Sequence, residues 1–117
     1  MNFTYESINE IRPALSKLSK LDLKATEAVK LARLLGKVEN ELRYFEETRM
    51  SLFKKYGEAK NGAYEIKDEN REVFLKEYRE LCNTEIEIEA EKVTIKSEIS
   101  IDASSVLALD GLVEFSE

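Results

Sequence analysis

The chain has 117 residues and a net charge of −6, and charged residues make up 36% of it, above the usual quarter. That length predicts one domain with a modest core, and hydrophobic residues at 43% argue against global disorder. Histidine is absent and Cys82 is the single cysteine, which excludes histidine-based metal sites, Cys–His and Ser–His nucleophiles, and an internal disulfide. We expect neither a signal peptide nor a transmembrane span, because the start lacks a basic stretch followed by an apolar one and no apolar run approaches 18 residues. We therefore expect a cytoplasmic, non-enzymatic protein with no cofactor, no metal and no membrane contact.

Charge is distributed unevenly along the chain. Residues 1–57 carry 11 basic and 8 acidic side chains, whereas residues 58–117 carry 7 basic and 16 acidic ones. From Glu98 to the end there are five acids and no base. Nucleic-acid backbones bind clustered lysine and arginine, so we expect no direct nucleic-acid binding. An acidic half is instead typical of a protein that attracts a basic surface on another protein.

The first predicted element is a helix that begins near Ser7. Ser7 and Glu10 form the S-x-x-E pattern of a capping box, in which each side chain satisfies a free backbone donor. Pro13 lies inside the helical pattern, where it favours a kink or a start closer to Arg12. The apolar residues at the spacing of one helix face are Ile8, Ile11, Leu15 and Leu18.

A long helix over residues 24–56 dominates the predicted fold. It contains no proline and one internal glycine, Gly36, and Gly57 is a candidate for the left-handed cap that ends it. Apolar residues recur every three or four positions along it, and Arg49 is the one interruption. We expect this seam to serve for packing or for oligomerisation. Its central residues are Leu31, Leu35, Val38, Leu42, Phe45, Arg49 and Leu52.

The second half changes from helical to alternating periodicity. The pair Asn61-Gly62 predicts a turn, and Asp68 is a candidate N-cap for a third helix over residues 69–81. Asp102 is the candidate N-cap of a short helix that ends near Leu109. Two or three short antiparallel strands are predicted between these helices, in residues 84–89 and around Val93, Ile95, Ile99 and Ile101.

Together these elements predict an α+β fold that is mainly α. The long helix (about 24–56) forms a helical hairpin with the first helix and packs against the third. A small antiparallel β-meander and a short C-terminal helix complete the fold. We expect a single domain over residues 1–117, with a helical part at about 7–82 and a β-rich acidic part at about 84–117.

The clearest local feature is a row of glutamates, Glu85, Glu87, Glu89 and Glu91, and these are the candidate partner-binding residues. A negative strip would attract a basic partner. The same oxygens would suit a hard cation such as Mg²⁺ or Ca²⁺, although no D-x-D-x-D-G loop supports that interpretation. The simplest interpretation is the solvated face of a strand, whose like charges deter edge-to-edge pairing.

Two single residues also have alternative interpretations. Arg49 is a polar residue in the seam, and one interpretation is that it fixes the register or the choice of partner. We favour the other interpretation, in which its aliphatic stem passes the core and its guanidinium pairs with Glu46. Cys82 follows a helix end among acids, where a small apolar role is expected rather than a reactive thiolate.

Four stretches stand out by pattern and composition: IRPALSKLSKLDLKATEAVKLARLL, SLFKKYGE, EVFLKEYRELCNTEIEIEAEKVTI and ISIDASSVLALDGLVEF. In these stretches the chain resembles a family of small uncharacterised proteins from phages and prophages of Gram-positive bacteria. The resemblance implies a phage origin and the cytoplasm of a bacterial host cell. It brings no catalytic or binding residues to this sequence.

Small size, acidity and the missing catalytic inventory predict a protein-binding protein. We expect an antagonist or modulator of a host defence or nucleic-acid-processing system, and mimicry of nucleic acid by Glu85–Glu91 is one form of this. The alternative is a virion assembly or scaffolding component that forms homo-oligomers through the long helix. A hydrolase that uses only carboxylates and a metal is a third hypothesis. Because the seam is largely used by the protein's own helices or by a copy of itself, we expect a foreign partner to meet the acidic second half.

Overall fold

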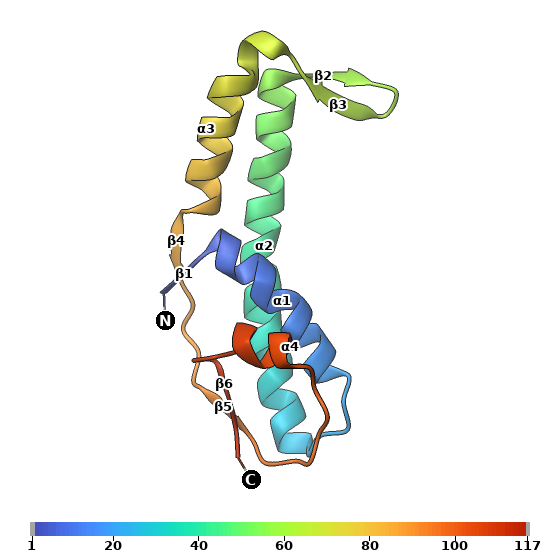
Figure 1. Cartoon of the computed structure of the whole chain (residues 1–117), viewed down its shortest axis with the longest axis vertical. Coiled ribbons are helices and arrows are strands. Elements are labelled where there is room, and N and C mark those ends of the chain that lie inside the picture. The colour runs from blue at the N-terminus through green and yellow to red at the C-terminus, as the bar shows by residue number, and fades with distance from the viewer. Residues whose placement is uncertain (1, 117) are drawn as a thin grey trace.

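The computed structural model describes residues 2–116. Figure 1 shows an elongated molecule built along one helix, α2 (Ala25–Tyr56), with principal extents of 55 × 29 × 23 Å. α3 (Arg71–Cys82) lies beside one half of α2, α1 (Tyr5–Ser19) crosses the other half, and α4 (Ala103–Ala108) packs on α1. The predicted mainly helical α+β fold is confirmed, as are the hairpin of the first two helices and the packing of the third on α2. Within residues 2–116, no helix combines the length and the apolar character needed to cross a membrane.

The described strands form three separate two-stranded sheets. The antiparallel pairs are β1 (Asn2–Thr4) with β4 (Glu85–Glu87) and β2 (Gly57–Lys60) with β3 (Ala63–Ile66), and the parallel pair is β5 (Val93–Ile95) with β6 (Val113–Phe115). A single 3₁₀ turn, η1 (Asp68–Asn70), leads into α3 within the described chain.

The predicted antiparallel meander is therefore wrong in its pairing. β4 takes its partner from the start of the chain, and β5 pairs in parallel with the last strand. A parallel pair needs a crossover connection, and here the connection runs through α4. Ile99 and Ile101, which continue the alternating pattern, lie in no strand.

α1 begins at Tyr5, and Thr4 is its N-cap. Thr4 has extended backbone because it ends β1, and its Oγ1 accepts a hydrogen bond from the N–H of Ser7 at 3.2 Å. The Ser7 Oγ accepts from the N–H of Thr4 at 3.1 Å, which completes the capping box. The predicted cap at Ser7 is thus three residues too late. Pro13 lies inside the helix on its exposed face.

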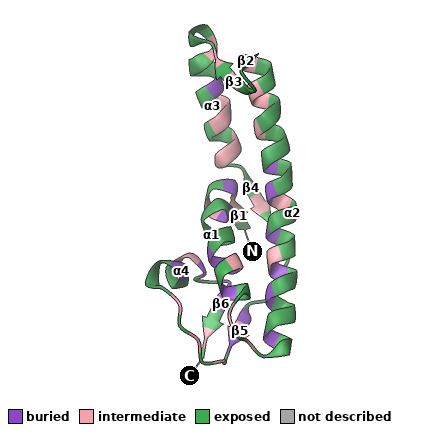
Figure 2. Cartoon of the chain, turned by 90° about the vertical axis from the view of Figure 1, so that its right-hand side faces the viewer, coloured by how far each residue is buried: buried purple, intermediate pink, exposed green. Residues whose placement is uncertain are grey.

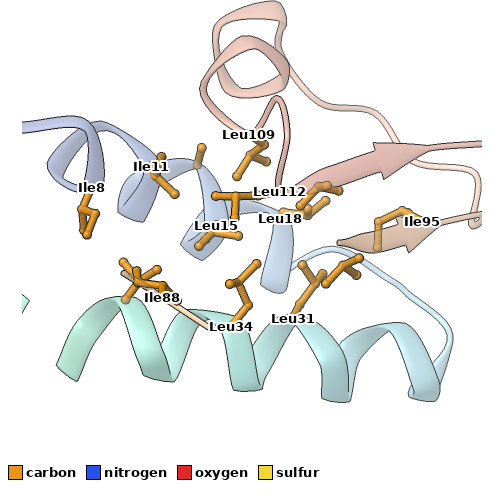
Figure 3. Packing of buried hydrophobic residues seen from close by; sticks show 14 of the residues in the cluster. Ile8, Ile11, Leu15, Leu18, Leu31, Leu34, Ile88, Ile95, Leu109 and Leu112 are labelled. Carbon is orange, nitrogen blue, oxygen red and sulfur yellow. The ribbon is translucent and has the colours of Figure 1, made fainter. Parts of the chain in front are cut away.

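One hydrophobic core fills the half of the molecule where α1 crosses α2. Figure 3 shows Ile8, Ile11, Leu15 and Leu18 of α1 facing Leu31 and Leu34 of α2. The C-terminal third closes the remaining sides with Ile88, Ile95, Leu109 and Leu112. Each such buried side chain contributes about 1.5–3 kcal/mol. The acidic second half is therefore folded onto the helical first half.

The other half of α2 is covered by α3 through aromatic contacts. Figure 2 shows that buried positions gather where α1 crosses α2 and become sparse along α3. Phe74 is the buried residue of α3, and its ring centroid lies 5.1 Å from that of Phe53 and 5.9 Å from that of Tyr78. The first of these aromatic pairs is tilted and the second is stacked, and pairs at these separations stabilise the contact beyond the area that they bury.

The end of α2 passes directly into the β2–β3 hairpin. The predicted turn at Asn61 and Gly62 is confirmed, because both residues have positive φ, 52° and 80°. The predicted left-handed cap at Gly57 is wrong. Gly57 is the C-cap of α2 and its N–H donates to the Phe53 carbonyl oxygen, but its backbone is extended, with φ −117° and ψ 170°, because it also begins β2.

Gly57→Ala is expected to destabilise the protein by roughly 1–3 kcal/mol, because a Cβ there would lie 2.7 Å from the Phe53 carbonyl oxygen and 3.0 Å from that of Glu65. Gly36→Ala is the matched control. A Cβ at Gly36 meets nothing within 4 Å, so helix propensity should stabilise this variant by about 0.5–1 kcal/mol. Urea denaturation measures both changes. A Gly57→Ala variant as stable as the wild type would contradict the close approach.

Candidate protein-binding site

The predicted glutamate row lies on the surface. All four side chains are exposed. Glu85 and Glu87 belong to β4, whereas Glu89 and Glu91 lie in the irregular stretch before β5. Between residues 2 and 116, no three His, Cys, Asp or Glu side chains are grouped so as to hold a metal ion. The alternating strand geometry thus holds for the first two glutamates, and the row is not one continuous strand face.

The seam of α2 is mostly turned into the protein's own core. Arg49 lies at its half-buried end and donates from Nε and Nη2 to Glu46 Oε2, at 3.2 and 2.9 Å. Its guanidinium also lies 5.8 Å from the ring centroid of Phe53. Cys82 is half-buried. Among the seam residues, those buried are Leu31, Val38, Leu42 and Phe45, and those half-buried are Leu35, Arg49 and Leu52.

An apolar groove is lined by residues of β5, β6, α4 and the loop that leads to α4. Figure 1 shows these elements at the end of the molecule opposite the β2–β3 hairpin. The volume of the groove is about 780 Å³. The polar residues that complete its rim are Lys96, Ser97, Glu98, Ser100 and Ser116. The apolar side chains that line it are Ile95, Ile99, Ile101, Val106 and Phe115. We call this feature the C-terminal groove.

One wall of the C-terminal groove is a segment with unused backbone hydrogen-bonding groups. Residues 98–101 belong to no helix or strand, and within the described chain none of their backbone N–H or carbonyl groups has a hydrogen-bond partner. Ile99 and Ile101 of this segment are half-buried against the core, while Glu98 and Ser100 are exposed. The segment therefore has the alternating pattern of a strand without the neighbouring strand.

Glu27 of α2 anchors the start of this segment. Its side chain is 6% exposed, accepts from the Lys96 N–H at 2.5 Å and accepts from the Ser97 hydroxyl. The Lys24 N–H also donates to Glu27 Oε1, at 3.3 Å. The hydrogen bond from Ser97, followed by that from the Lys96 N–H, lowers the pKa of Glu27 from its ordinary value of 4.5. A carboxylate that accepts these bonds holds β5 and the loop against α2.

Asp102 anchors the other end. It is the N-cap of α4, as predicted, and accepts from the Ser105 N–H at 3.2 Å. Lys17 of α1 donates to Asp102 Oδ1 at 2.8 Å. This bond and those from the hydroxyls of Ser104 and Ser105 hold the pKa of Asp102 well below its ordinary value of 3.8. Both ends of residues 98–101 are thus fixed by carboxylates, and the segment between them is left open.

The C-terminal part of the chain, which supplies most of the groove lining, is acidic. Residues 98–116 carry four carboxylates and no lysine or arginine, and Lys96 is the basic residue that lines the groove. The carboxylates are those of Glu98, Asp102, Asp110 and Glu114. Asp102 is paired with Lys17, whereas the other three carboxylates form no ion pair with a described residue.

The sequence alone did not identify Glu27 as a site residue. An acid in the first turn of a helix ordinarily satisfies the helix end, and Glu27 does so through Lys24. Its bonds to Lys96 and Ser97 join positions about 70 residues apart, and no local pattern predicts them. The one sequence signal for the groove wall is the alternation of Ile99 and Ile101, which indicates a strand-like segment.

Comparison with protein-family models, with curated proteins and with solved structures finds no match to this chain.

Proposed function

We propose that the protein binds another protein, and that the C-terminal groove receives an extended segment of that partner. The observation that carries this proposal is the open segment 98–101, whose backbone donors and acceptors border an apolar groove. An extended peptide laid beside it would form strand-like main-chain hydrogen bonds. Alternate side chains of the peptide would enter the groove against Ile99, Ile101 and Phe115.

Charge supports a basic partner. An extended peptide with two or more lysines or arginines beside its apolar residues would be attracted by Glu98 in the groove lining and, at longer range, by Asp110 and Glu114 outside it. The groove also explains how the partner's register would be chosen, since backbone pairing supplies affinity and the pockets for alternate side chains supply specificity.

The wider role is part of the same proposal. In the setting that the phage resemblance implies, the partner belongs to a bacterial host and the protein acts as its antagonist or modulator. The exposed glutamates Glu85 and Glu87 would add long-range attraction for the basic partner rather than contact its apolar segment. Oligomerisation through the seam of α2 is less well supported, since Leu31, Val38 and Leu42 are used within the monomer.

The proposal is tested by selecting extended peptides from a random library on the immobilised protein and measuring their affinity for two variants. Val106→Arg places a cation at the apolar lining, where Val106 is 39% exposed. We expect it to weaken binding of the selected peptides at least tenfold, because it fills the groove and repels their basic residues.

Val73→Arg is the matched control, since Val73 is 48% exposed on α3, far from the C-terminal groove. Its peptide affinity should stay within twofold of the wild type. Selected peptides should be rich in apolar and basic residues, and their affinity should fall as salt is raised. An equal loss of peptide affinity in Val106→Arg and Val73→Arg, or the selection of acidic peptides, would contradict the proposed groove.

A further inference from the structure

A second pocket, distinct from the C-terminal groove, is lined by four basic side chains in an otherwise acidic protein. It lies between α2 and the stretch before β5 and has a volume of about 220 Å³. Three of its cations, Lys30, Arg33 and Lys37, project from one side of α2 at spacings of three and four residues, and Lys92 comes from the facing stretch. We call this feature the basic pocket.

Within residues 2–116, the four cations of the basic pocket have no acidic partner. Seven lysines or arginines elsewhere form ion pairs with carboxylates, but in the described part of the chain none of these four does. Lys37 instead donates from Nζ to the carbonyl oxygen of Glu89, which joins the two walls of the pocket. Glu91 is the single carboxylate in the lining, so the lining carries a net charge of about +3.

The floor of the basic pocket is apolar. Leu34 and Val93 are buried there, and Ala90 is half-buried beside them. The four cations are exposed around this floor, so their attraction for an anion adds up at the mouth of the pocket and is screened by salt. The arginine contributes a planar fork that binds a phosphate with two hydrogen bonds, and the lysines contribute mobile point charges.

From this arrangement we propose that the basic pocket binds a small ligand that contains two adjacent phosphate groups. The pocket is smaller than the 300–1,000 Å³ typical of sites for drug-sized molecules, which suits a diphosphate group rather than a large ligand. Three net positive charges match the charge of a diphosphate near neutral pH. A free diphosphate and the diphosphate of a nucleotide share this chemistry, and affinity distinguishes them.

Isothermal titration calorimetry of the full chain with inorganic pyrophosphate tests the proposal at low salt. We expect one binding site for pyrophosphate. Arg33→Gln should weaken the affinity for pyrophosphate at least tenfold, and so should the double variant Lys30→Gln with Lys92→Gln. Lys54→Gln is the control, because Lys54 is an exposed residue of α2 outside the pocket and makes no ion pair with a described residue. The affinity of the Lys54→Gln variant for pyrophosphate should match that of the wild type.

Adenosine diphosphate is titrated in parallel. If adenosine diphosphate binds with the same affinity as pyrophosphate, only the diphosphate group is recognised. If adenosine diphosphate binds more tightly, the ligand is a nucleotide. Both results support the proposed diphosphate site. The proposal is overturned if pyrophosphate does not bind, or if Lys54→Gln weakens it as much as Arg33→Gln does. It is also overturned if a single-stranded oligonucleotide binds where pyrophosphate does not, since the cations would then serve a nucleic-acid backbone.

Discussion

Leu15→Ala is expected to lower the free energy of unfolding by about 2–5 kcal/mol. Leu15 is 0% exposed and lies at the centre of the packing between α1 and α2 (Figure 3). Its removal leaves a cavity between two helices that the hairpin cannot close. Domains of this size have about 5–15 kcal/mol of stability in total, so the variant should be close to unfolding.

Urea denaturation followed by circular dichroism measures this effect, with Leu107→Ala as the matched control. Leu107 is 76% exposed on α4, and its truncation should change the unfolding free energy by less than about 0.5 kcal/mol. A Leu15→Ala variant that unfolds at the same urea concentration as Leu107→Ala would contradict the shared core of the two helices.

Glu27→Gln is expected to release the loop that forms the wall of the C-terminal groove. An amide cannot accept hydrogen bonds from both Lys96 and Ser97 with the strength of a carboxylate, so one anchor of residues 98–101 is weakened. We expect the melting temperature to fall by roughly 5 °C and hydrogen exchange at the Lys96 amide to become at least tenfold faster. Glu47→Gln, on the exposed side of the same helix, should change neither measurement.

The same carboxylate makes stability depend on pH in a defined direction. The pKa of Glu27 is lower in the folded protein than its ordinary value of 4.5, so its contribution is complete above that value. It is lost as the pH falls through the lower, folded-state pKa. The pKa of Asp102 is also lowered in the folded protein, so its contribution to stability is likewise lost as the pH falls below its ordinary value of 3.8. The wild type should therefore lose stability on acidification below about pH 4.5, and Glu27→Gln should lose less over the same range.

The helices could be predicted from the sequence because their signals are local. Apolar residues at three- and four-residue spacing identified the long helix to within one residue at its start, and Asn61-Gly62 identified the hairpin turn. The start of α1 was misplaced because two overlapping capping patterns are present. The pattern that forms is chosen by β1, which gives Thr4 the extended backbone of an N-cap.

Strand pairing and the candidate sites could not be predicted in the same way. Alternation identifies a strand but not its partner, and the partners of β4 and β5 lie at opposite ends of the chain. The spacing of Lys30, Arg33 and Lys37 is visible in the sequence, but Lys92 joins them only through tertiary packing. Glu27 shows the same limit, because a residue that anchors a distant loop has the local appearance of an ordinary helix cap.

The most direct test of the proposed groove is hydrogen exchange at the amides of Ile99, Ser100 and Ile101, measured by NMR with and without a selected peptide. In the free protein we expect these amides to exchange rapidly, because they have no hydrogen-bond partner among the described residues. Bound peptide should slow at least one of them tenfold or more, while the amides of α3 remain unchanged. Amides that are already protected in the free protein, or that stay unprotected when the peptide is saturating, would contradict strand-like pairing in the groove.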